Sequence, residues 1–408
     1  MSLSIKAQVA RLGDGPLTEV GIREHVWPLF SRTLARRGQI YLANHSLGRP
    51  LDQTAIDVRE GLDLWYEQMD DAWGVGGWLD EMNRFRANVA KLIGLADSSG
   101  VVPKTSAGQG LRAVLNSFAF ERPIRVVATR GEFDSVDFIL KAYVEKGRVE
   151  IRWIEPTLFD QGVPLFAEGA ILDAIVDGTD LLILSQIVFA TGQIMPGLAQ
   201  AVARAHEVGA RVLVDSYHAV GVIRVFMEEL DADFMIGGSY KYTRGGPGAC
   251  WLAIHPRNQH LKSLDTGWFA KREPFGYERP ELPERAVGGD GWLESTPPVL
   301  IFYQARAGME FTLEVGIDRL REYSLRQQDL LKAEFLRNGV PCFQPSEPSH
   351  FGAFALVPNS SAHEASSRLK QMGVNTDARG NAIRFGPDIL TSQDELREAA
   401  RLAAQILG

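Results

Sequence analysis

The sequence has little cysteine, no run of basic residues and no long apolar segment, and each absence excludes a class of protein. Only two cysteines occur in 408 residues, Cys250 and Cys342, which excludes a disulfide framework and a zinc pattern. The net charge of −8 gives no reason to expect nucleic acid or an anionic membrane as a partner. No stretch of about 18 apolar residues occurs, and the N-terminal residues lack the apolar core of a signal peptide. We therefore expect a cytoplasmic protein without a metal site.

Strands and helices are expected to alternate from about Val101 to Ile254. Short apolar runs bounded by turn residues predict strands, and apolar positions at helical spacing predict helices. This alternation favours an α/β fold with a mainly parallel sheet covered by helices. The expected strands are Ile124–Thr129, Ile151–Trp153, Leu181–Ile187, Val212–Val214, Phe234–Ile236 and Cys250–Ile254. The expected helices along the chain include Gln53–Glu67, Asp80–Ile93, Leu111–Phe120, Ser135–Lys146 and Leu198–Glu207.

The length of the chain leaves room for two domains, and its composition is typical of a globular protein, with 45% hydrophobic and 23% charged residues. Residues 1–40 are expected to form a mostly helical arm and residues 41–297 a large domain. Residues 298–408 are expected to form a small α+β C-terminal domain, which begins with a long helix broken near Val315. The segment Leu264–Gly291 is rich in Gly, Pro and charge, which predicts a long functional loop or a subunit contact.

Lys241 lies between an apolar run that ends in two glycines and the glycine-rich turn Gly245–Gly248. The apolar residues on both sides predict two buried strands, so Lys241 is placed on the short connection between them. A lysine that is partly desolvated there has a lowered amine pKa and can form a Schiff base with an aldehyde. A lysine of a surface loop is the alternative interpretation.

Asp215 lies upstream, at the end of the predicted strand in VLVDSYHAV. Open α/β sheets bind ligands at the carboxyl ends of their strands. A carboxylate at this place can pair with a protonated pyridine nitrogen, and His218 can pack against the ring or form a hydrogen bond to it. Alternatively, Asp215 caps the following helix. A purely structural role explains the combination of Asp215 and Lys241 poorly.

Five stretches between Tyr41 and Pro387 resemble one enzyme family. They are YLANHSLGRP at Tyr41–Pro50, DSYHAVG at Asp215–Gly221, GGSYKYTRGGPGA at Gly237–Ala249, STPPVL at Ser295–Leu300 and AIRFGP at Ala382–Pro387. The chain resembles the pyridoxal 5′-phosphate (PLP) enzymes of class V, which have the aspartate aminotransferase fold (fold type I), and among them the kynureninases. The resemblance implies PLP as the cofactor, an amino acid as the small-molecule substrate, and a homodimer with shared active sites.

Further segments are expected around the cofactor. The small residues of Val102–Gly110 precede a helix, whose N-terminal N–H groups can bind a phosphate. The resemblance implies a phosphate loop there, an aromatic residue over the pyridine ring, a tyrosine beside the lysine that moves protons, and two residues that reach the phosphate of a neighbouring subunit. The cofactor residues so implied, besides Lys241 and Asp215, are Ser106, Ala107, Gly108, Phe133, Ser135, His218, Tyr240, Trp268 and Thr296. Without the resemblance, Phe133 fits an ordinary core aromatic and Trp268 a loop aromatic equally well.

Arg384 is the candidate ligand of the substrate α-carboxylate, because a planar guanidinium can bind a carboxylate through two hydrogen bonds. Its apolar neighbours Ile383 and Phe385 predict a strand from which the arginine faces a cleft. A surface salt bridge is the alternative role for Arg384, and Arg379 is the second candidate for the carboxylate.

Several positions depart from the pattern of the resembled family. Val136 stands where an aspartate is expected, with Asp137 displaced by one residue. Gln186 replaces a histidine, and it either contacts cofactor or substrate or is a satisfied buried amide. Thr296 replaces an asparagine, and Pro387–Leu390 replaces a Pro-Leu-Tyr-Asn run. These departures leave the exact substrate open.

The resemblance implies a kynureninase-type hydrolase, in which Lys241, Tyr240 and Asp215 are the catalytic residues. It would cleave the Cβ–Cγ bond of kynurenine or 3-hydroxykynurenine to give anthranilate or 3-hydroxyanthranilate, and alanine. A class V aminotransferase, epimerase or cysteine desulfurase is the first alternative. A desulfurase needs a reactive cysteine, and both cysteines lie in apolar sequence. A noncatalytic binding protein with the same fold is the second alternative.

Overall fold

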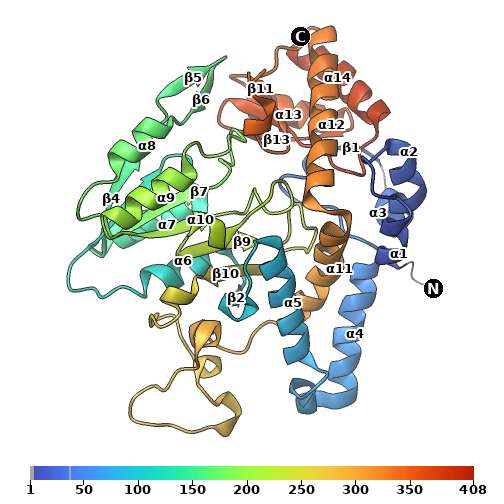
Figure 1. Cartoon of the computed structure of the whole chain (residues 1–408). Helices are drawn as coiled ribbons and strands as arrows, with labels where there is room; N and C mark the ends of the chain where they lie inside the picture. The colour runs from blue at the N-terminus through green and yellow to red at the C-terminus, as the bar shows by residue number, and fades with distance from the viewer. Residues whose placement is uncertain (1–3, 36–37) are drawn as a thin grey trace.

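The computed structural model describes residues 4–35 and 38–408. A seven-stranded sheet forms the centre of the large part of the molecule (Figure 1), with the strand order β2-β10-β9-β8-β7-β3-β4. Strand β10 runs antiparallel to both of its neighbours, and the other pairs are parallel. The strands are β2 Val101–Lys104, β3 Ile124–Thr129, β4 Val149–Ile154, β7 Leu181–Ser185, β8 Arg211–Asp215, β9 Phe234–Gly238 and β10 Cys250–Ile254. The predicted α/β fold with a mainly parallel sheet is confirmed.

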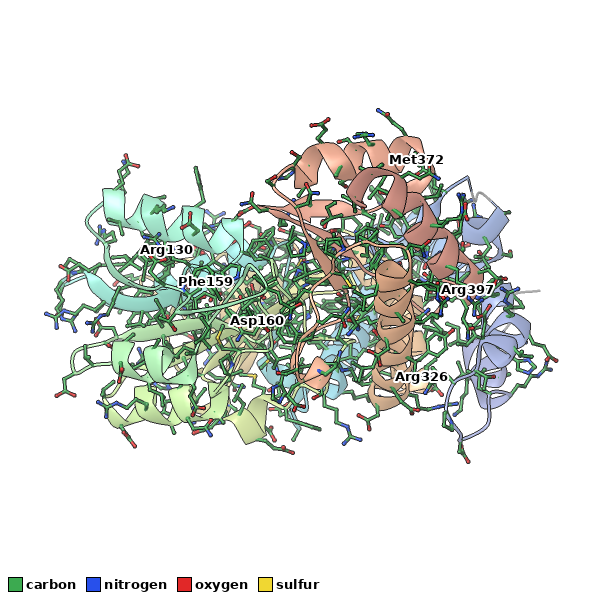
Figure 2. All side chains as sticks on the ribbon, turned by 90° about the horizontal axis from the view of Figure 1, so that it is seen from above. Arg130, Phe159, Asp160, Arg326, Met372 and Arg397 are labelled. Carbon is green, nitrogen blue, oxygen red and sulfur yellow. The ribbon has the colours of Figure 1, made fainter. Side chains whose placement is uncertain are left out.

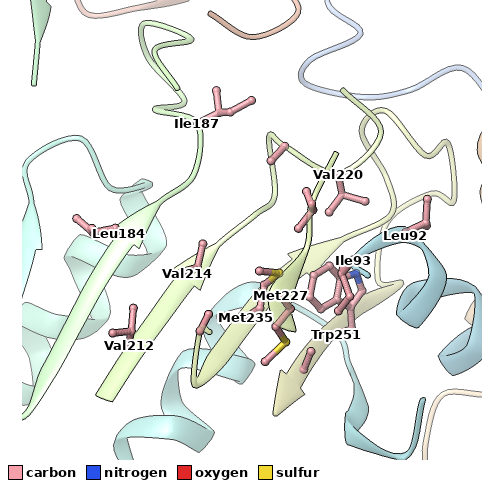
Figure 3. Close-up of a cluster of buried hydrophobic side chains, with 14 of the residues drawn as sticks. Leu92, Ile93, Leu184, Ile187, Val212, Val214, Val220, Met227, Met235 and Trp251 are labelled. Carbon is pink, nitrogen blue, oxygen red and sulfur yellow. The ribbon is translucent and has the colours of Figure 1, made fainter. Parts of the chain in front are cut away.

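Both faces of this sheet are buried, because successive side chains of a strand point to opposite sides. On β7, Leu182 and Leu184 belong to one apolar cluster, which also contains Val214 of β8 (Figure 3). Leu181 and Ile183 belong to a second cluster on the other side. Residues of α5 Trp78–Leu92, α9 Leu198–Glu207 and α11 Leu300–Val315 complete the first cluster, and residues of α6 Ala107–Leu115 and α7 Asp134–Glu145 complete the second. Continuous apolar runs such as LLILS are typical of strands covered on both faces.

Three short strands were not expected from the sequence. Strand β2 contains Pro103 and lies at the edge of the sheet, where a residue without an N–H group is tolerated. The hairpin formed by β5 Leu158–Asp160 and β6 Val163–Leu165 is separate from the large sheet. Helices α8 Glu168–Ala174 and α10 Met227–Leu230 complete the alternation.

The C-terminal part packs a small antiparallel sheet against helices. Its strand order is β11-β14-β13, and the elements are β11 Ala355–Pro358, α13 Ala362–Gln371, β13 Asp377–Arg379, β14 Ala382–Phe385 and α14 Gln393–Leu407. The predicted long helix is present as α11 and α12 Ile317–Arg337, and it is broken at Gly316, whose φ is 90°. Seen from above in Figure 2, Arg326 of α12 and Arg397 of α14 lie on the side of the molecule opposite to Arg130, which follows β3.

The N-terminal residues are mostly helical, as expected. They form α1 Ile5–Ala10, α2 Glu19–Gly21, a π-helical and a 3-10 turn over residues 22–30, and α3 Ser31–Ala35. Strand β1 Ile40–Tyr41 then pairs in parallel with β12 Val374–Asn375 of the C-terminal part. Helix α4 Gln53–Gln68 packs against α11. The predicted domain limits stay a prediction.

The segment 264–291 protrudes below the sheet in Figure 1 and contains only short 3-10 turns. In the described part of the chain, no helix is long and apolar enough to cross a membrane.

Candidate active site

A cavity of about 280 Å³ opens at the carboxyl ends of β7, β8 and β9. Asp215 ends β8, and Lys241 follows β9, its parallel neighbour. The predicted cofactor residues that line this cavity are Ser106, Ala107, Gly108, Phe133, Ser135, Asp215, His218, Tyr240 and Lys241. Nine residues from four separate segments therefore meet in one place. A second cavity, of about 340 Å³, lies within the segment 264–291 and contains none of them.

Lys241 is almost fully buried, and its environment favours the uncharged amine. Its Nζ lies 2.6 Å from His218 Nε2 and 4.9 Å from the centre of the Tyr217 ring. Burial lowers the pKa of Lys241 to about 7, although the charge of Asp215 raises it. A large fraction of the amine is consequently available as a nucleophile or base at neutral pH.

His218 is held as the neutral ring beside this amine. Burial lowers the pKa of His218 well below its ordinary value, and the charges of Lys241 and Arg384 act in the same direction. Its Nδ1 atom is buried and has no hydrogen-bond partner in the described residues. A polar atom left unpaired in this way marks a site that a ligand can complete.

Asp215 is a buried carboxylate that forms no ion pair with any residue of the ranges 4–35 and 38–408. Its Oδ1 atom accepts a hydrogen bond from the Tyr217 backbone N–H at 2.8 Å. Burial raises the pKa of Asp215, and the hydrogen bond from Tyr217 and the charge of Lys241 oppose this rise. A protonated ring nitrogen placed in the cavity would compensate the carboxylate, so this acid fits a pyridinium partner.

Two helix N-termini face the same cavity, and their exposed N–H groups suit an anion. Ser106 caps α6, and its hydroxyl accepts a hydrogen bond from the Gln109 N–H at 3.1 Å. Ser135 lies in the first turn of α7, two residues after Phe133, which is the N-cap residue of that helix. Positive helix ends and hydroxyl groups are the usual ligands of a phosphate.

The residue after Ser135 contributes an apolar side chain to the cavity. Val136 is buried and lines the cavity. Asp137 points away, since its carboxylate forms an ion pair with Lys141 at 2.6 Å on the exposed side of α7. Gln186 is a buried amide whose Oε1 accepts a hydrogen bond from Ser216 at 3.0 Å, and it does not line the cavity. Asp137 therefore does not compensate for the aspartate that is missing at position 136.

Arg384 lies behind the cavity wall rather than on it. Its Nε and Nη2 atoms donate to the two carboxylate oxygens of Asp377, at 2.7 and 2.5 Å, and its Nη1 donates to the carbonyl of Phe189, which lines the cavity. Asp377 also binds His45, 2.8 Å from its Nε2, and accepts from the Ser46 hydroxyl. The guanidinium is thus already engaged by a carboxylate.

Arg379, the second candidate, is exposed at the end of β13. Its guanidinium donates to the Ala378 carbonyl at 3.2 Å, and it forms no ion pair with any residue of the described ranges. Its charge lowers the pKa of Lys241, as a minor contribution beside burial.

Trp268 and Thr296 do not reach the cavity of their own chain. They contact each other, because the Trp268 Nε1–H donates to the Thr296 hydroxyl at 3.2 Å. Their expected role, which is at the phosphate of a neighbouring subunit, stays a prediction.

Other cavity residues were not expected from the sequence. Phe189 meets Phe133 edge to face, with ring centres 5.2 Å apart. Tyr217 contacts the sulfur of Cys250 at 3.0 Å. Ser185 ends β7 in register with Asp215, and the rule that ligands bind at strand ends would have identified it. Its hydroxyl donates to Glu132, a buried acid whose pKa is raised to about 7 by burial.

Comparison with known proteins places this site in a family. The model of the family described as aminotransferase class-V matches residues 77–389. A kynureninase from Bacillus anthracis is 25% identical over 387 residues, with 91% of this chain and 89% of the relative covered. A kynureninase from Pseudomonas fluorescens is 25% identical over 399 residues, with 93% and 92% covered. The predicted resemblance to kynureninases is confirmed.

Solved structures show the same fold. A mutant of C-DES with glycine covalently linked to its PLP cofactor superposes with a TM-score of 0.80 at 18% identity, and the match covers 92% of this chain and 98% of that one. The apo cysteine desulfurase of Thermococcus onnurineus NA1 has a TM-score of 0.79 at 17% identity, and the match covers 94% and 98%. The predicted fold type I is confirmed.

Proposed function

The chain belongs to the aminotransferase class-V family, and from that premise we propose that it is a hydrolase of the kynureninase type. Its cofactor is pyridoxal 5′-phosphate, as the sequence predicts. The proposed reaction adds water across the Cβ–Cγ bond of kynurenine or 3-hydroxykynurenine, and the products are anthranilate or 3-hydroxyanthranilate, and alanine. The observation that carries the proposal is the pairing of Lys241 and Asp215 in one cavity, in a chain whose relatives of matching length are named kynureninase.

Each residue of the cavity has a role in holding the cofactor. PLP supplies an aldehyde for a lysine amine and a ring that stabilises negative charge at the substrate α-carbon. Lys241 would hold the aldehyde, and Asp215 would keep the ring nitrogen protonated. The N-termini of α6 and α7 would bind the phosphate. Phe133 and His218 would pack against the ring.

Two residues move protons in the proposed reaction. The Lys241 amine removes the proton from the substrate α-carbon, for which its pKa of about 7 is suited. Burial raises the pKa of Tyr240, so its hydroxyl keeps its proton at neutral pH. Tyr240 can therefore donate a proton near the γ-carbonyl while water adds to it and the Cβ–Cγ bond breaks.

The alternative activities have less support from the site. A cysteine desulfurase needs a reactive thiolate. Burial raises the pKa of Cys250 to about 11 and also raises the pKa of Cys342. The structural similarity to desulfurases, at 17–18% identity, concerns the fold alone. The presence of Lys241 with Asp215 argues against a noncatalytic role.

The decisive experiment is an assay of the purified, PLP-loaded protein with kynurenine and with 3-hydroxykynurenine. The fluorescent anthranilate product and alanine should appear in equal amounts. Cysteine with a sulfide readout, and an amino acid with a keto-acid readout, serve as parallel assays. Sulfide or a keto acid without anthranilate would refute the proposal and select a different class V reaction.

We propose that Arg384 binds the substrate α-carboxylate. On binding, its guanidinium gives up part of its hydrogen bonding to Asp377. Arg384→Ala should then raise KM by the factor that corresponds to about 2–5 kcal/mol, the usual cost of removing one partner of a buried charged pair. Absorbance of the bound cofactor should hardly change. Arg379→Ala is the matched control and should have a much smaller effect. A larger rise of KM in Arg379→Ala would transfer the role to Arg379.

We also propose a homodimer with shared active sites, because Trp268 and Thr296 lie away from the cavity of their own chain. Sedimentation should show dimers. Lys241→Ala and Trp268→Ala proteins should each be nearly inactive. Subunit exchange between them should restore about a quarter of the activity. About half of the dimers then contain one subunit of each kind, and each such dimer has one intact site out of two. A monomer with full cofactor occupancy, or no recovery after exchange, would contradict shared sites.

A further inference from the structure

Asp388 is buried between two arginines that come from different turns. Its Oδ1 atom accepts a hydrogen bond from Arg49 Nη2, and its Oδ2 accepts one from Arg244 Nη2 at 3.0 Å. Asp388, Arg49 and Arg244 are 8%, 9% and 5% exposed. We call these three residues the two-arginine clamp. Since two guanidinium groups share one carboxylate, loss of Asp388 would leave two buried cations without an anion.

Arg244 belongs to the turn that carries Lys241, and its backbone is strained. Its φ is 56°, in the left-handed region that residues with a side chain seldom adopt. Its N–H donates to the Lys241 carbonyl at 3.2 Å, and its Nη1 donates to the Tyr242 carbonyl at 2.6 Å. The contact with Asp388 holds this side chain from outside the turn.

The segment around Arg49 lies against the other side of the same turn. The Gly48 N–H donates to the Tyr240 carbonyl at 2.8 Å. A Cβ atom at Gly48 would come within 1.9 Å of the Lys241 carbonyl oxygen, so the two backbones are in close contact. Asp388 thereby connects the segment of Arg49 to the turn of Arg244, and the Lys241 backbone lies between these two arginines.

We propose that Asp388 is a positioning residue for Lys241. By bridging Arg49 and Arg244 it keeps the strained turn in the conformation that aims the lysine amine at the cofactor aldehyde. The inference rests on Lys241 as the PLP-binding lysine of the proposed function, and it does not depend on kynurenine as the substrate.

The test is the rate at which apoprotein and PLP form a borohydride-reducible adduct on the Lys241 peptide. Asp388→Asn should slow this labelling roughly tenfold or more, because a small misplacement of a reacting group is costly. Asp57→Asn is the matched control, since Asp57 is also buried and accepts from Arg306 at 2.8 Å but does not line the cavity. Both substitutions should lower the melting temperature, and only Asp388→Asn should slow the labelling. Equal labelling rates in the two variants would overturn the proposal.

A second substitution separates positioning from folding. Asparagine adopts positive φ more readily than arginine, and Arg244→Asn also removes one of the two cations. Asp388→Asn should therefore have little effect on labelling in the Arg244→Asn background. An undiminished effect there would refute the proposal. The Asp388→Asn protein by itself could fail to fold. In that case, folding of the variant that carries both Asp388→Asn and Arg244→Asn supports the clamp, and failure of this double variant to fold as well refutes it. Absence of label on Lys241 in the unsubstituted protein would instead refute the proposed function.

Discussion

Lys241→Ala should abolish turnover and the borohydride-stable label on the protein together. Lys241 is the one lysine among the cavity-lining residues of the described ranges, and a large fraction of its buried amine is uncharged at neutral pH. The substitution removes both the group that holds the aldehyde and the base at the α-carbon, so turnover should fall on the order of 10⁴-fold or more. In the unsubstituted protein, labelling should weaken as the pH falls below about 7, because the amine then becomes protonated.

Lys104→Ala provides the matched control for this prediction. Lys104 lies at the end of β2 and is also buried. Its amine forms an ion pair with Glu294 at 2.6 Å, and the residue does not line the cavity. This variant should keep the label. Peptide mapping that finds the label on Lys104, or on any lysine other than Lys241, would show that the site has been assigned wrongly.

The sequence predicts the centre of the fold well, because that part is governed by local signals. Strands β3 and β10 and helix α9 have the predicted limits. Each is a strongly apolar or amphipathic run bounded by turn residues, so burial and periodicity agree. Strand β2 was missed because Pro103 disfavours a central strand and because its position at the edge is set by the pairing with β10.

For the site, too, the sequence predicts what neighbouring strands bring together and does not predict the contacts between distant segments. Asp215 ends β8 and Lys241 follows the adjacent strand β9, and strand order alone brings them together. The network in which Asp377 binds both Arg384 and His45 was not foreseen, because His45 and Asp377 are 332 residues apart. The same holds for Asp388 and Arg49, which are separated by 339 residues. No local pattern reports such a contact, and the packing of the C-terminal part against the large sheet decides which charge meets which.

Asp215→Asn should slow turnover by about 10²–10³-fold while PLP stays bound. Asparagine keeps the size of the side chain and can still accept the Tyr217 N–H, so the local structure should persist. It cannot carry the negative charge that would keep a ring nitrogen protonated, and the stabilisation of charge at the α-carbon is lost. The proposed phosphate ligands at α6 and α7 and the Lys241 side chain are retained, which is why the cofactor should remain.

The same substitution should also move the pH dependence of labelling in a defined direction. The charge of Asp215 raises the pKa of Lys241 against the larger effect of burial. Its removal should therefore lower the pH midpoint for labelling of Lys241. Asp233→Asn is the control, because Asp233 is buried beside β9, binds Arg257 at 2.8 Å and does not line the cavity. Turnover close to normal in Asp215→Asn, or a midpoint that rises, would exclude the proposed role of Asp215.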